Sequence, residues 1–451
     1  MFTTAYAFRS FHINGVDFSI FEWMLVNKPH SHYLHSAIYN VNHFGIHPSW
    51  ILLPLIPIYQ IFASPWVLLI IGATVVWLAG LALFHQGNIH GLTKWDSLIL
   101  ATGFWLSAFA GRLIQQGFRI ESFYPLAIIL FLHSFETKSL YYIFFAALFC
   151  LSIKEDAPLF VAPVLLLESY RKQSYHYLLL GLFSLGFLVI QIKYLQPYFL
   201  GSTYISPPYL KFWGHLGSNL NQILWSAFSD PIEICLDILN SSWWTIYLPF
   251  LGLPLISLRS TVCILLPMLV LGSASSHSQM HTYQSYYPVP LFAALCWAMI
   301  EIYPYFQRPG RYKIWQVACI LSPIWHSGWI TWRAPNHTLL HEVAIVRSKI
   351  QQVAPTLQVC AQPVLFPHLG TDINLQLLDK NCHNAILAPH ADPFPLQSNQ
   401  IDWLVKYNQN IYPSEQLVVI PHIQQPNLWK SLLQKTFAKT INKTKNGHKK
   451  A

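Results

Sequence analysis

Residues 65–84 read PWVLLIIGATVVWLAGLALF and contain no charged side chain. A helix needs about 20 predominantly apolar residues to cross the hydrocarbon core of a bilayer, and this run meets that requirement. Of the 451 residues in the chain, 53% are hydrophobic and only 10% are charged, whereas a soluble domain carries about 25% charged residues. This balance excludes a disordered chain and an enzyme that is soluble as a whole, and it predicts a polytopic membrane protein.

Further apolar segments repeat the same pattern along the chain. Several are shorter than a full span, which is typical of helices that break inside a bundle where they line a cavity. Residues 50–62 are interrupted by Pro54 and Pro57, so they predict an interfacial or half-inserted helix. The predicted fold class is mainly α, a polytopic membrane helix bundle with about ten spans. The other apolar segments are residues 97–113, 123–135, 140–153, 157–167, 177–194, 243–258, 261–272, 287–303 and 314–332.

Lysine and arginine residues give the bundle an orientation, because they favour cytoplasmic loops. With residues 1–50 outside, alternation leaves Arg119 and Lys154 in the short outer loops, each close to an acid. The net charge of +9 then reflects cytoplasmic bias plus a basic tail, which predicts a solvated tail and no nucleic-acid partner. The cytoplasmic loops hold Lys94, Lys138, Arg171, Lys172, Arg259, Arg308, Arg311 and Lys313.

The composition changes near residue 333, where apolar runs shorten to strand length and polar residues return. Residues 339–353 have apolar positions at helical spacing. Short strand candidates follow between turn residues. A helix followed by spaced strands predicts a small α/β domain, which the alternation places on the non-cytoplasmic side. The strand candidates are residues 357–361, 385–387, 402–407 and 416–420.

These changes in composition predict four parts of the chain. Residues 1–63 form a first outer loop with interfacial helices, 64–332 the transmembrane bundle, 333–435 the extracytoplasmic α/β domain and 436–451 the basic tail. Cys360 and Cys382 lie in the third part and could pair. No Cys-x-x-Cys motif occurs, so the cysteines indicate neither a zinc site nor redox chemistry, and no metal ligands are predicted.

The chain has only 18 Asp and Glu residues, so the position of each acid is informative. Asp17 and Glu22 belong to the segment GVDFSIFEW, residues 15–23, which predicts a short amphipathic helix. Asp17 could be the N-cap of that helix, because Asp is a preferred capping residue. A carboxylate at the membrane surface could equally act as a general base. Both interpretations stay open.

Four more polar clusters interrupt the apolar pattern. Lys154, Glu155 and Asp156 lie between two apolar runs, and charges at membrane depth are costly and generally functional; a tight loop that reaches water is the alternative. Arg119, close to Glu121, could clamp a phosphate or form an ordinary ion pair. Side chains in the other two clusters could bind sugar hydroxyls or phosphate, or could lie in solvated turns. They are His43, His47, His277, Gln279 and His281.

All five clusters fall on the outer side in this alternation. They place carboxylates, cations and imidazoles over an apolar bundle. The pattern predicts an outward-facing polar cavity that suits a substrate with a lipid tail and a phosphorylated head.

The order of the motifs resembles the prokaryotic membrane family named domain of unknown function 2079, over nearly the whole chain. The motifs are moderately specific in combination and weak singly. They are GVDFSIFEW (15–23), NHFGIHPSWILLPLIPIYQIF (42–62), FRIESFYPLAI (118–128), LSIKEDAPLFV (151–161), SQMHTYQSYYPVPLFAAL (278–295) and VAPTLQVCAQPVLFPHLG (353–370).

That family is grouped by remote similarity with the GT-C superfamily of membrane glycosyltransferases. The resemblance implies transfer of a sugar from a polyprenyl-phosphate donor on the non-cytoplasmic face. It also implies that a carboxylate of the first outer loop is the inverting general base. The matching position here is Asp17, with Glu22 as a second candidate. Family members usually have a span ahead of this loop, and the sequence given begins only a few residues before Asp17.

The partners implied are a polyprenyl-phosphate-linked sugar, membrane lipid and an acceptor of unknown chemistry, at a bacterial inner membrane. No cofactor is indicated with certainty, and a divalent cation stays open. The alternative is a transporter, or a lipid-binding or structural membrane protein without catalysis. Transporters often contain inverted repeats and broken helices at mid-depth. No repeat is visible here and the charges gather at one face, so the pattern favours the enzyme.

Overall fold

The structure is a computed structural model of the chain, and it describes most of the helical part and segments of the C-terminal part. The described residues are 2–11, 13, 15–26, 34–36, 41–137, 139–201, 208–276, 287–326, 336–353, 358–362, 365–369, 374–377, 385–387, 412–413 and 418–420.

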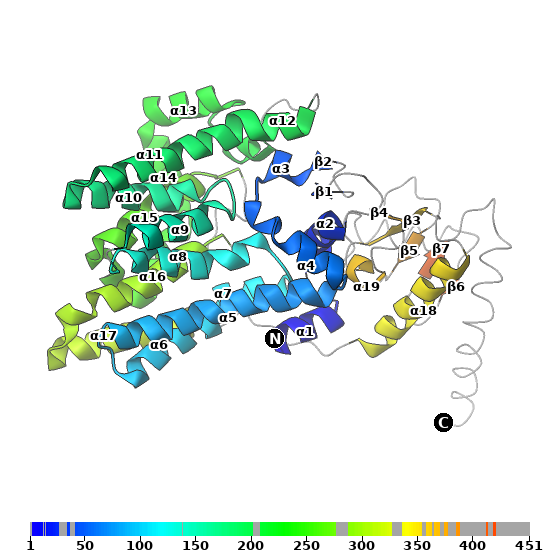
Figure 1. The fold of residues 1–451 in the computed structure, drawn as a ribbon, viewed down its shortest axis with the longest axis horizontal. Coiled ribbons are helices and arrows are strands. Elements are labelled where there is room, and N and C mark those ends of the chain that lie inside the picture. Colours follow the sequence, from blue (N-terminus) through cyan, green and yellow to red (C-terminus); the bar gives the residue numbers. More distant parts are fainter. Residues whose placement is uncertain are drawn as a thin grey trace.

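Helices of unequal length lie side by side along the long axis of the molecule (Figure 1). The longest uninterrupted α-helix of the bundle, α5 (Pro65–Ile89), has Pro in its first turn, where no backbone N–H is needed. α5 packs along α6 (Lys94–Leu106). The side chain of Ser107 then caps α7 (Ala108–Gln115), and α6 and α7 are bent by 46° at this break. The predicted segment 97–113 is therefore a broken pair of helices.

The rest of the bundle follows the predicted apolar segments in order, with one exception given below. It begins with the short helix η2 (Ile120–Phe123) and continues through helices that are often interrupted. They are α8 (Tyr124–Ser134), α9 (Leu140–Leu151), α10 (Pro158–Lys172), α11 (Tyr175–Ile190), the π-helical turn η3 (Gln191–Leu195), α12 (Gln196–Leu200), α15 (Leu258–Gly272), α16 (Val289–Ile302), η8 (Tyr303–Phe306) and α17 (Pro309–His326).

The prediction of about ten spans is not confirmed. In the described part of the chain, three helices are long and apolar enough to cross a membrane, or four if the bent pair counts as one span. Four further apolar helices in this part of the chain are shorter than the roughly 17 residues that a span needs: Trp50–Ile61, Ile120–Ser134, Leu140–Leu151 and Leu258–Gly272. The three helical stretches are Pro65–Ile89, Tyr175–Leu200 and Val289–Phe306.

Residues 243–258 are not a span, contrary to the prediction. They form two 3₁₀ helices, η6 (Trp243–Phe250) and η7 (Leu253–Ile256). Pro249 lies inside the first, and Gly252, with φ of 69°, separates the two. Because 3₁₀ hydrogen bonds have poorer geometry, such helices stay short. Trp243, Ile246 and Phe250 are buried in the core, whereas the other large apolar side chains of the segment are partly or largely exposed.

Residues 50–62 form two short pieces, η1 (Trp50–Leu52) and α4 (Leu55–Ile61). Pro54 lies at the N-cap of α4, and Ile61 and Phe62 are exposed. The segment is too short to span a bilayer, as predicted from its two prolines.

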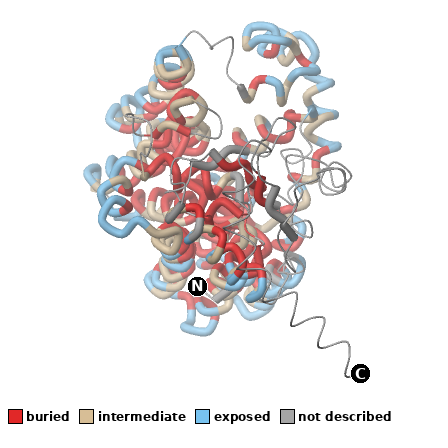
Figure 2. The backbone as a smooth tube through the Cα atoms, turned by 90° about the vertical axis from the view of Figure 1, so that its right-hand side faces the viewer, coloured by how far each residue is buried: buried red, intermediate tan, exposed pale blue. Residues whose placement is uncertain are grey.

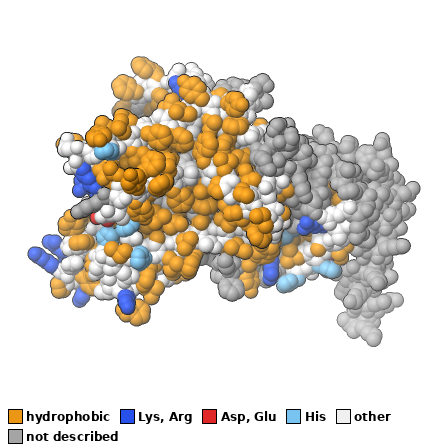
Figure 3. Space-filling model, in the orientation of Figure 1, with side chains coloured by type: hydrophobic (Ala, Val, Ile, Leu, Met, Phe, Trp, Pro, Cys, Tyr) orange, Lys and Arg blue, Asp and Glu red, His pale blue; other side chains and the backbone are white. Residues whose placement is uncertain are grey.

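The core of the bundle is organised around α16, which is almost wholly buried. Figure 2 shows buried segments at the centre of the tube and exposed turns around them. Trp315 of α17 reaches into this core and donates a hydrogen bond from Nε1 to the backbone oxygen of Met299 at 2.8 Å. Hydrophobic side chains cover much of the outer surface of the bundle, and several Lys and Arg side chains project at its left-hand end (Figure 3). An apolar belt of this kind is expected where helices face lipid.

The C-terminal part contains an α/β unit, as predicted. Helix α18 (His337–Val353) precedes a five-stranded sheet with the order β4-β3-β5-β7-β6. β3 pairs in parallel with β4 and β5, whereas β7 pairs antiparallel with β5 and β6. The strands are β3 (Gln358–Ala361), β4 (Asn374–Leu377), β5 (Ala385–Leu387), β6 (Tyr412–Pro413) and β7 (Val418–Ile420).

The unit contains one strand that was not predicted, and two predicted features fall on residues that the structure does not describe. β4 was not predicted, and the predicted strand 402–407 lies outside the described residues. Cys360 in β3 forms a disulfide, while its predicted partner Cys382 also lies outside the described residues.

The N-terminal segment packs against this C-terminal unit. α1 (Phe2–Arg9) and α2 (Gly15–Val26) lie at the same end of the bundle as α19 (Phe366–Leu369) (Figure 1). The ring of Phe8 stacks on His368 with centroids 4.2 Å apart, and Trp23 stacks on Phe366 at 6.0 Å. The first outer loop and the C-terminal unit therefore share one end of the molecule.

Candidate functional site

Four of the five predicted polar clusters meet at that end of the bundle. The meeting point lies where α2, η2, the short helix α3 (His43–Ile46) and the 152–157 turn between α9 and α10 come together. The backbone of η1 ties this arrangement to the turn, because Ile51 N–H donates to the oxygen of Ser152 at 2.8 Å. We call the group the outer polar cluster. Its ionisable members are Asp17, His43, His47, Arg119, Glu121, Lys154, Glu155 and Asp156.

Asp17 lies at the edge of the cluster, in the first turn of α2. Since α2 begins at Gly15, Asp17 is not the N-cap residue; a carboxylate in the first turn still interacts favourably with the helix dipole. Its Oδ2 accepts a hydrogen bond from Arg119 Nη1 at 2.5 Å, and the same nitrogen also donates to Gln116 at 2.9 Å. The Asp17 side chain is 26% exposed, whereas that of Arg119 is 8% exposed. The carboxylate is therefore held by Arg119 and is partly exposed.

A chain of ion pairs continues inward from Arg119. Its Nε lies 3.5 Å from Glu121 Oε2, and the other oxygen of Glu121 accepts a hydrogen bond from Lys154 Nζ at 3.3 Å. These three side chains are buried. Buried charges of this kind are held in place by their partners, so the ion pairs fix η2 against the 152–157 turn.

Glu155 and Asp156 lie on the other side of Lys154 and have different partners. Glu155 Oε1 accepts a hydrogen bond from His47 Nδ1 at 2.7 Å, and Asp156 accepts one from the hydroxyl of Tyr124. Burial opposes ionisation, but the neighbouring His47 and Lys154 lower the pKa of Glu155. Burial, together with Glu155, raises the pKa of Asp156 despite the nearby Lys154. The pKa values of the two adjacent carboxyl groups are therefore shifted in opposite directions.

His43 is the most deeply buried histidine of the cluster. Burial, with a contribution from His47, lowers the pKa of His43 from 6.5 to about 3. Its ring contacts Phe21 edge-on at 5.5 Å and lies 5.9 Å from the ring of His47. His43 is therefore neutral at physiological pH.

Several buried polar atoms around the cluster have no hydrogen-bond partner among the described residues. Burying such an atom without a partner costs about 1–3 kcal/mol, so these atoms are expected to bind substrate or water in the working protein. They lie on α3, η1, η2 and the adjoining turns. The atoms are His43 Nε2, Ser49 Oγ, Trp50 Nε1, Ser122 Oγ and Glu155 Oε2.

Glu22, the second predicted base, occupies a different environment. Its side chain is buried, and its Oε1 accepts a hydrogen bond from the hydroxyl of Tyr59 in α4 at 2.8 Å. This contact joins α2 to the short outer helix. The geometry gives Glu22 a role in packing and leaves Asp17 as the partly exposed acid of α2.

We expect Tyr59→Phe to lower the free energy of unfolding by about 1–3 kcal/mol, because a buried carboxyl oxygen loses its donor. Tyr141→Phe is the matched control, since Tyr141 is highly exposed and a surface change there is expected to stay within about 0.5 kcal/mol. The measurement is denaturant unfolding of the two detergent-purified variants. Equal stability of both variants would show that the Glu22 contact contributes nothing.

The fifth predicted cluster, with His277, Gln279 and His281, lies outside the described residues. Tyr287, which lies a little further along the sequence, reaches the outer polar cluster. Lys154 Nζ lies 5.7 Å from the centroid of the Tyr287 ring, within the range of a cation–π contact. The start of α16 is therefore part of the wall of the site.

No group of three or more His, Cys, Asp or Glu side chains placed to hold a metal ion is found among the described residues. The cations that could face a phosphate are also already paired with carboxylates. Arg119 contacts Asp17 and Glu121, and Lys154 contacts Glu121.

Two polar clusters elsewhere were not predicted from the sequence. Near the outer side, His215 contacts Asp237 at 2.8 Å and Ser276 at 3.1 Å. The carboxylate belongs to α14 (Pro231–Asn240), which follows the amphipathic helix α13 (Leu220–Ser229). In the sequence, this cluster was indicated only by Asp237, an isolated acid within residues 231–240, which mix polar and apolar side chains.

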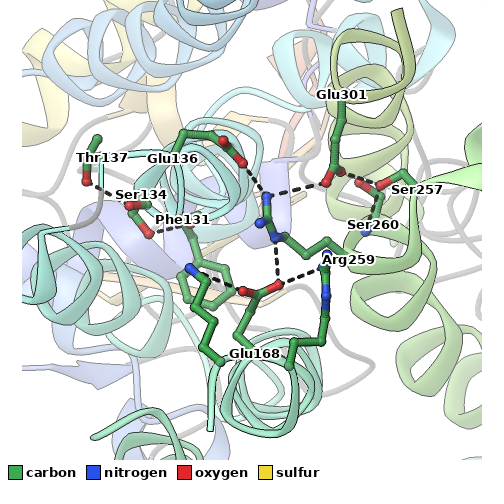
Figure 4. Close-up of polar contacts among 11 residues, drawn as sticks. Phe131, Ser134, Glu136, Thr137, Glu168, Ser257, Arg259, Ser260 and Glu301 are labelled. Atoms are coloured by element: carbon green, nitrogen blue, oxygen red, sulfur yellow. Dashed lines mark hydrogen bonds and ion pairs between the residues drawn. The ribbon is translucent and has the colours of Figure 1, made fainter. Parts of the chain in front are cut away.

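The other unpredicted cluster lies at the opposite end of the bundle, around Arg259 (Figure 4). The guanidinium Nε donates to Glu168 at 2.9 Å, and Nη1 lies 3.3 Å from Glu301 and also contacts Glu136. The Glu168 side chain also pairs with Arg171 and Lys172 of its own helix. We name these four residues, Arg259, Glu136, Glu168 and Glu301, the inner ion cluster. Sequence reasoning treated its arginine only as a loop charge.

The comparisons with other proteins agree with the membrane character of the chain. A family model described as "Predicted membrane protein (DUF2079)" matches residues 7–418. None of the curated proteins compared with the chain is similar to it. Among solved structures, ArnT from Cupriavidus metallidurans in the apo state is similar, with 9% sequence identity and a TM-score of 0.48 over 93% of this chain and 96% of that chain. A likeness at that score does not by itself establish a shared fold.

Proposed function

The chain belongs to the DUF2079 family of predicted membrane proteins, and on that premise we propose that it is a membrane glycosyltransferase of GT-C type. It moves a sugar, with inversion, from a polyprenyl-phosphate donor to an acceptor on the outer face of a bacterial inner membrane. The observation that carries the proposal is the position of Asp17. This carboxylate is partly exposed, held at 2.5 Å by a buried arginine, and placed at one end of an apolar bundle.

The disulfide of Cys360 supports an outer location for this site. Disulfides persist in oxidising compartments and are rare in the bacterial cytosol. The unit that contains Cys360 packs directly on α1 and α2, where Asn336 N–H donates to the backbone oxygen of Arg9 at 3.0 Å. Asp17 lies on α2 and therefore on the same side of the membrane as the disulfide.

Asp17 has the geometry of a general base for a direct displacement. Its partly exposed carboxylate can accept the proton of an acceptor hydroxyl, while Arg119 keeps the carboxylate in one orientation. The hydroxyl oxygen then attacks the anomeric carbon, and the bond between that carbon and the phosphate oxygen breaks. A single displacement inverts the anomeric configuration without a covalent enzyme intermediate. General-base assistance of this kind is worth about 10²–10⁴ in rate.

The alternative class, a transporter, receives less support from the described residues. A transport pathway needs access to the substrate from both faces in turn. At the inner end, Arg259 binds carboxylates from three other segments of the bundle, which fastens these helices together. The polar groups that the sequence predicted gather instead at the other end, where Asp17 and His47 are partly exposed.

The test uses membranes that contain the full chain and a panel of radiolabelled polyprenyl-phosphate hexoses. We expect label from at least one donor to enter an acceptor fraction, and the product linkage to have the anomeric configuration opposite to that of the donor. Membranes without the protein are the control. If no donor supports sugar transfer and sealed vesicles show donor-dependent uptake instead, the protein is a transporter and the proposed enzyme function is wrong.

A further inference from the structure

His47 is the most exposed basic side chain of the outer polar cluster. Its side chain is 30% exposed, compared with 8% for both Arg119 and Lys154. It directly follows α3, which places it beside the 152–157 turn. A phosphate that approaches the cluster would therefore meet the imidazole before it meets either buried cation.

We infer that His47, oriented by Glu155, donates a proton to the phosphate that leaves during sugar transfer. This inference rests on the proposed function and deepens it, because it assigns a proton donor to the leaving group opposite the base Asp17. His47 is then a catalytic residue, and Glu155 is a positioning residue that acts through it.

The contact with Glu155 defines which ring nitrogen faces the substrate. Nδ1 donates to Glu155 Oε1 at 2.7 Å, so Nε2 is the nitrogen left to bind substrate. A carboxylate at one nitrogen holds the orientation of the ring. Glu155 is itself buried in the turn between α9 and α10. The carboxylate that contacts His47 is therefore held in place by the surrounding protein.

The surroundings of His47 are compatible with a positive charge on its ring. The groups that face it are Glu155, the ring of His43, and at longer range Glu121 and Lys154. Because burial lowers the pKa of His43 to about 3, that neighbour is neutral and does not repel a proton on His47. The positive charge of Lys154 is offset by its contact with Glu121.

The other two cations cannot replace His47 as a proton donor. Arginine keeps its proton throughout the physiological range. Burial opposes the charged form of Lys154, but its carboxylate neighbours raise the pKa of this amine well above its usual range. Both residues can contribute positive charge to the site, whereas imidazole is the group that gives up and regains a proton near neutral pH.

His47 and Asp17 together account for the protons of the step. The sugar–phosphate linkage is a diester with one negative charge, and its cleavage leaves the electron pair on the phosphate oxygen. The proton on His47 Nε2 passes to that oxygen, and the product is a monoester with one negative charge. Asp17 holds the proton taken from the acceptor hydroxyl. Exchange with water afterwards returns both residues to their starting states.

The experiment measures kcat and KM for sugar transfer as a function of pH, with the polyprenyl-phosphate hexose that the wild-type protein uses. Wild-type kcat is expected to fall as pH rises, because His47 must be protonated. His47→Gln is expected to lower kcat by about 10²-fold, with a smaller change in KM, and to lose the alkaline fall. His176→Gln, which replaces an exposed histidine at the start of α11, is the matched control and should behave as wild type.

Glu155→Gln keeps an oxygen that can accept the Nδ1–H bond but removes the negative charge. The alkaline fall in kcat should therefore move to lower pH, which a merely structural role would not produce. If gel filtration shows that His47→Gln does not fold, the shift in Glu155→Gln alone tests the inference. Unchanged rate and pH profile in folded His47→Gln, or an unshifted fall in Glu155→Gln, would overturn the inference while the proposed function stands. A wild-type protein inactive with every donor would overturn both.

Discussion

Asp17→Asn is expected to reduce sugar transfer by about 10²–10⁴-fold while the protein remains folded. Asparagine has nearly the same shape as aspartate, and its carbonyl oxygen can still accept the hydrogen bond from Arg119 Nη1. It cannot accept a proton from an acceptor hydroxyl at neutral pH. The loss should therefore appear in kcat, with little change in gel-filtration behaviour.

Asp230→Asn is the matched control for this experiment. Asp230 is exposed and caps α14 by accepting a hydrogen bond from the backbone N–H of Glu233. Asparagine is as good a cap as aspartate, so transfer should be unchanged. If the Asp17→Asn variant is fully active in the same membranes, Asp17 is not the general base and another residue has that role.

The composition of the outer polar cluster could be predicted from the sequence, but its pairings could not. Few acids occur in an apolar chain, so each acid in a predicted outer loop was informative. Alternation of the segments predicted one side of the membrane for Asp17, Arg119, Glu121 and Lys154, and in the structure these residues contact one another. The contact between Asp17 and Arg119 joins positions that are 102 residues apart, and such a contact depends on how helices pack. Periodicity carries no information about it.

The errors have a common physical cause. Hydropathy measures burial, and burial occurs both in lipid and inside a bundle. Segments η6 and η7 are apolar and only partly buried, and their Pro and Gly residues prevent a continuous helix. The same ambiguity inflated the predicted number of spans. The strand β4 was missed because its sequence, NLQL, contains no β-branched or aromatic residue, the types enriched in strands.

The inner ion cluster shows the same limit for charged residues. Glu168 and Arg259 are separated by 91 positions, and Glu136 and Arg259 by 123. Each residue alone was a single charge near the end of an apolar segment. The positive-inside rule accounts for the arginine as a loop charge and says nothing of its partners. The packing of α10 against α15 brings Glu168 to Arg259, and the packing of α15 against α16 brings Glu301 to it.

Arg259→Met is expected to destabilise the bundle by about 3–5 kcal/mol, because removing one partner of a buried ion pair leaves uncompensated charge. The Glu168 side chain is 0% exposed and would lose its hydrogen bond from Arg259 Nε. Contacts from this arginine to Glu136 and Glu301 would also disappear. The measurement is denaturant unfolding of the purified protein in detergent.

Arg171→Met is the matched control, since it removes a second arginine from the same glutamate. The Arg171 side chain is 46% exposed, and an ion pair this exposed contributes only about 0–1 kcal/mol. The double variant Arg259→Met with Glu168→Gln should recover part of the lost stability, because the buried negative charge is removed together with its partner. Equal stability of Arg259→Met and Arg171→Met would mean that the inner ion cluster does not hold the helices together. Recovery in the double variant would instead identify the uncompensated charge of Glu168, rather than lost packing, as the source of the instability.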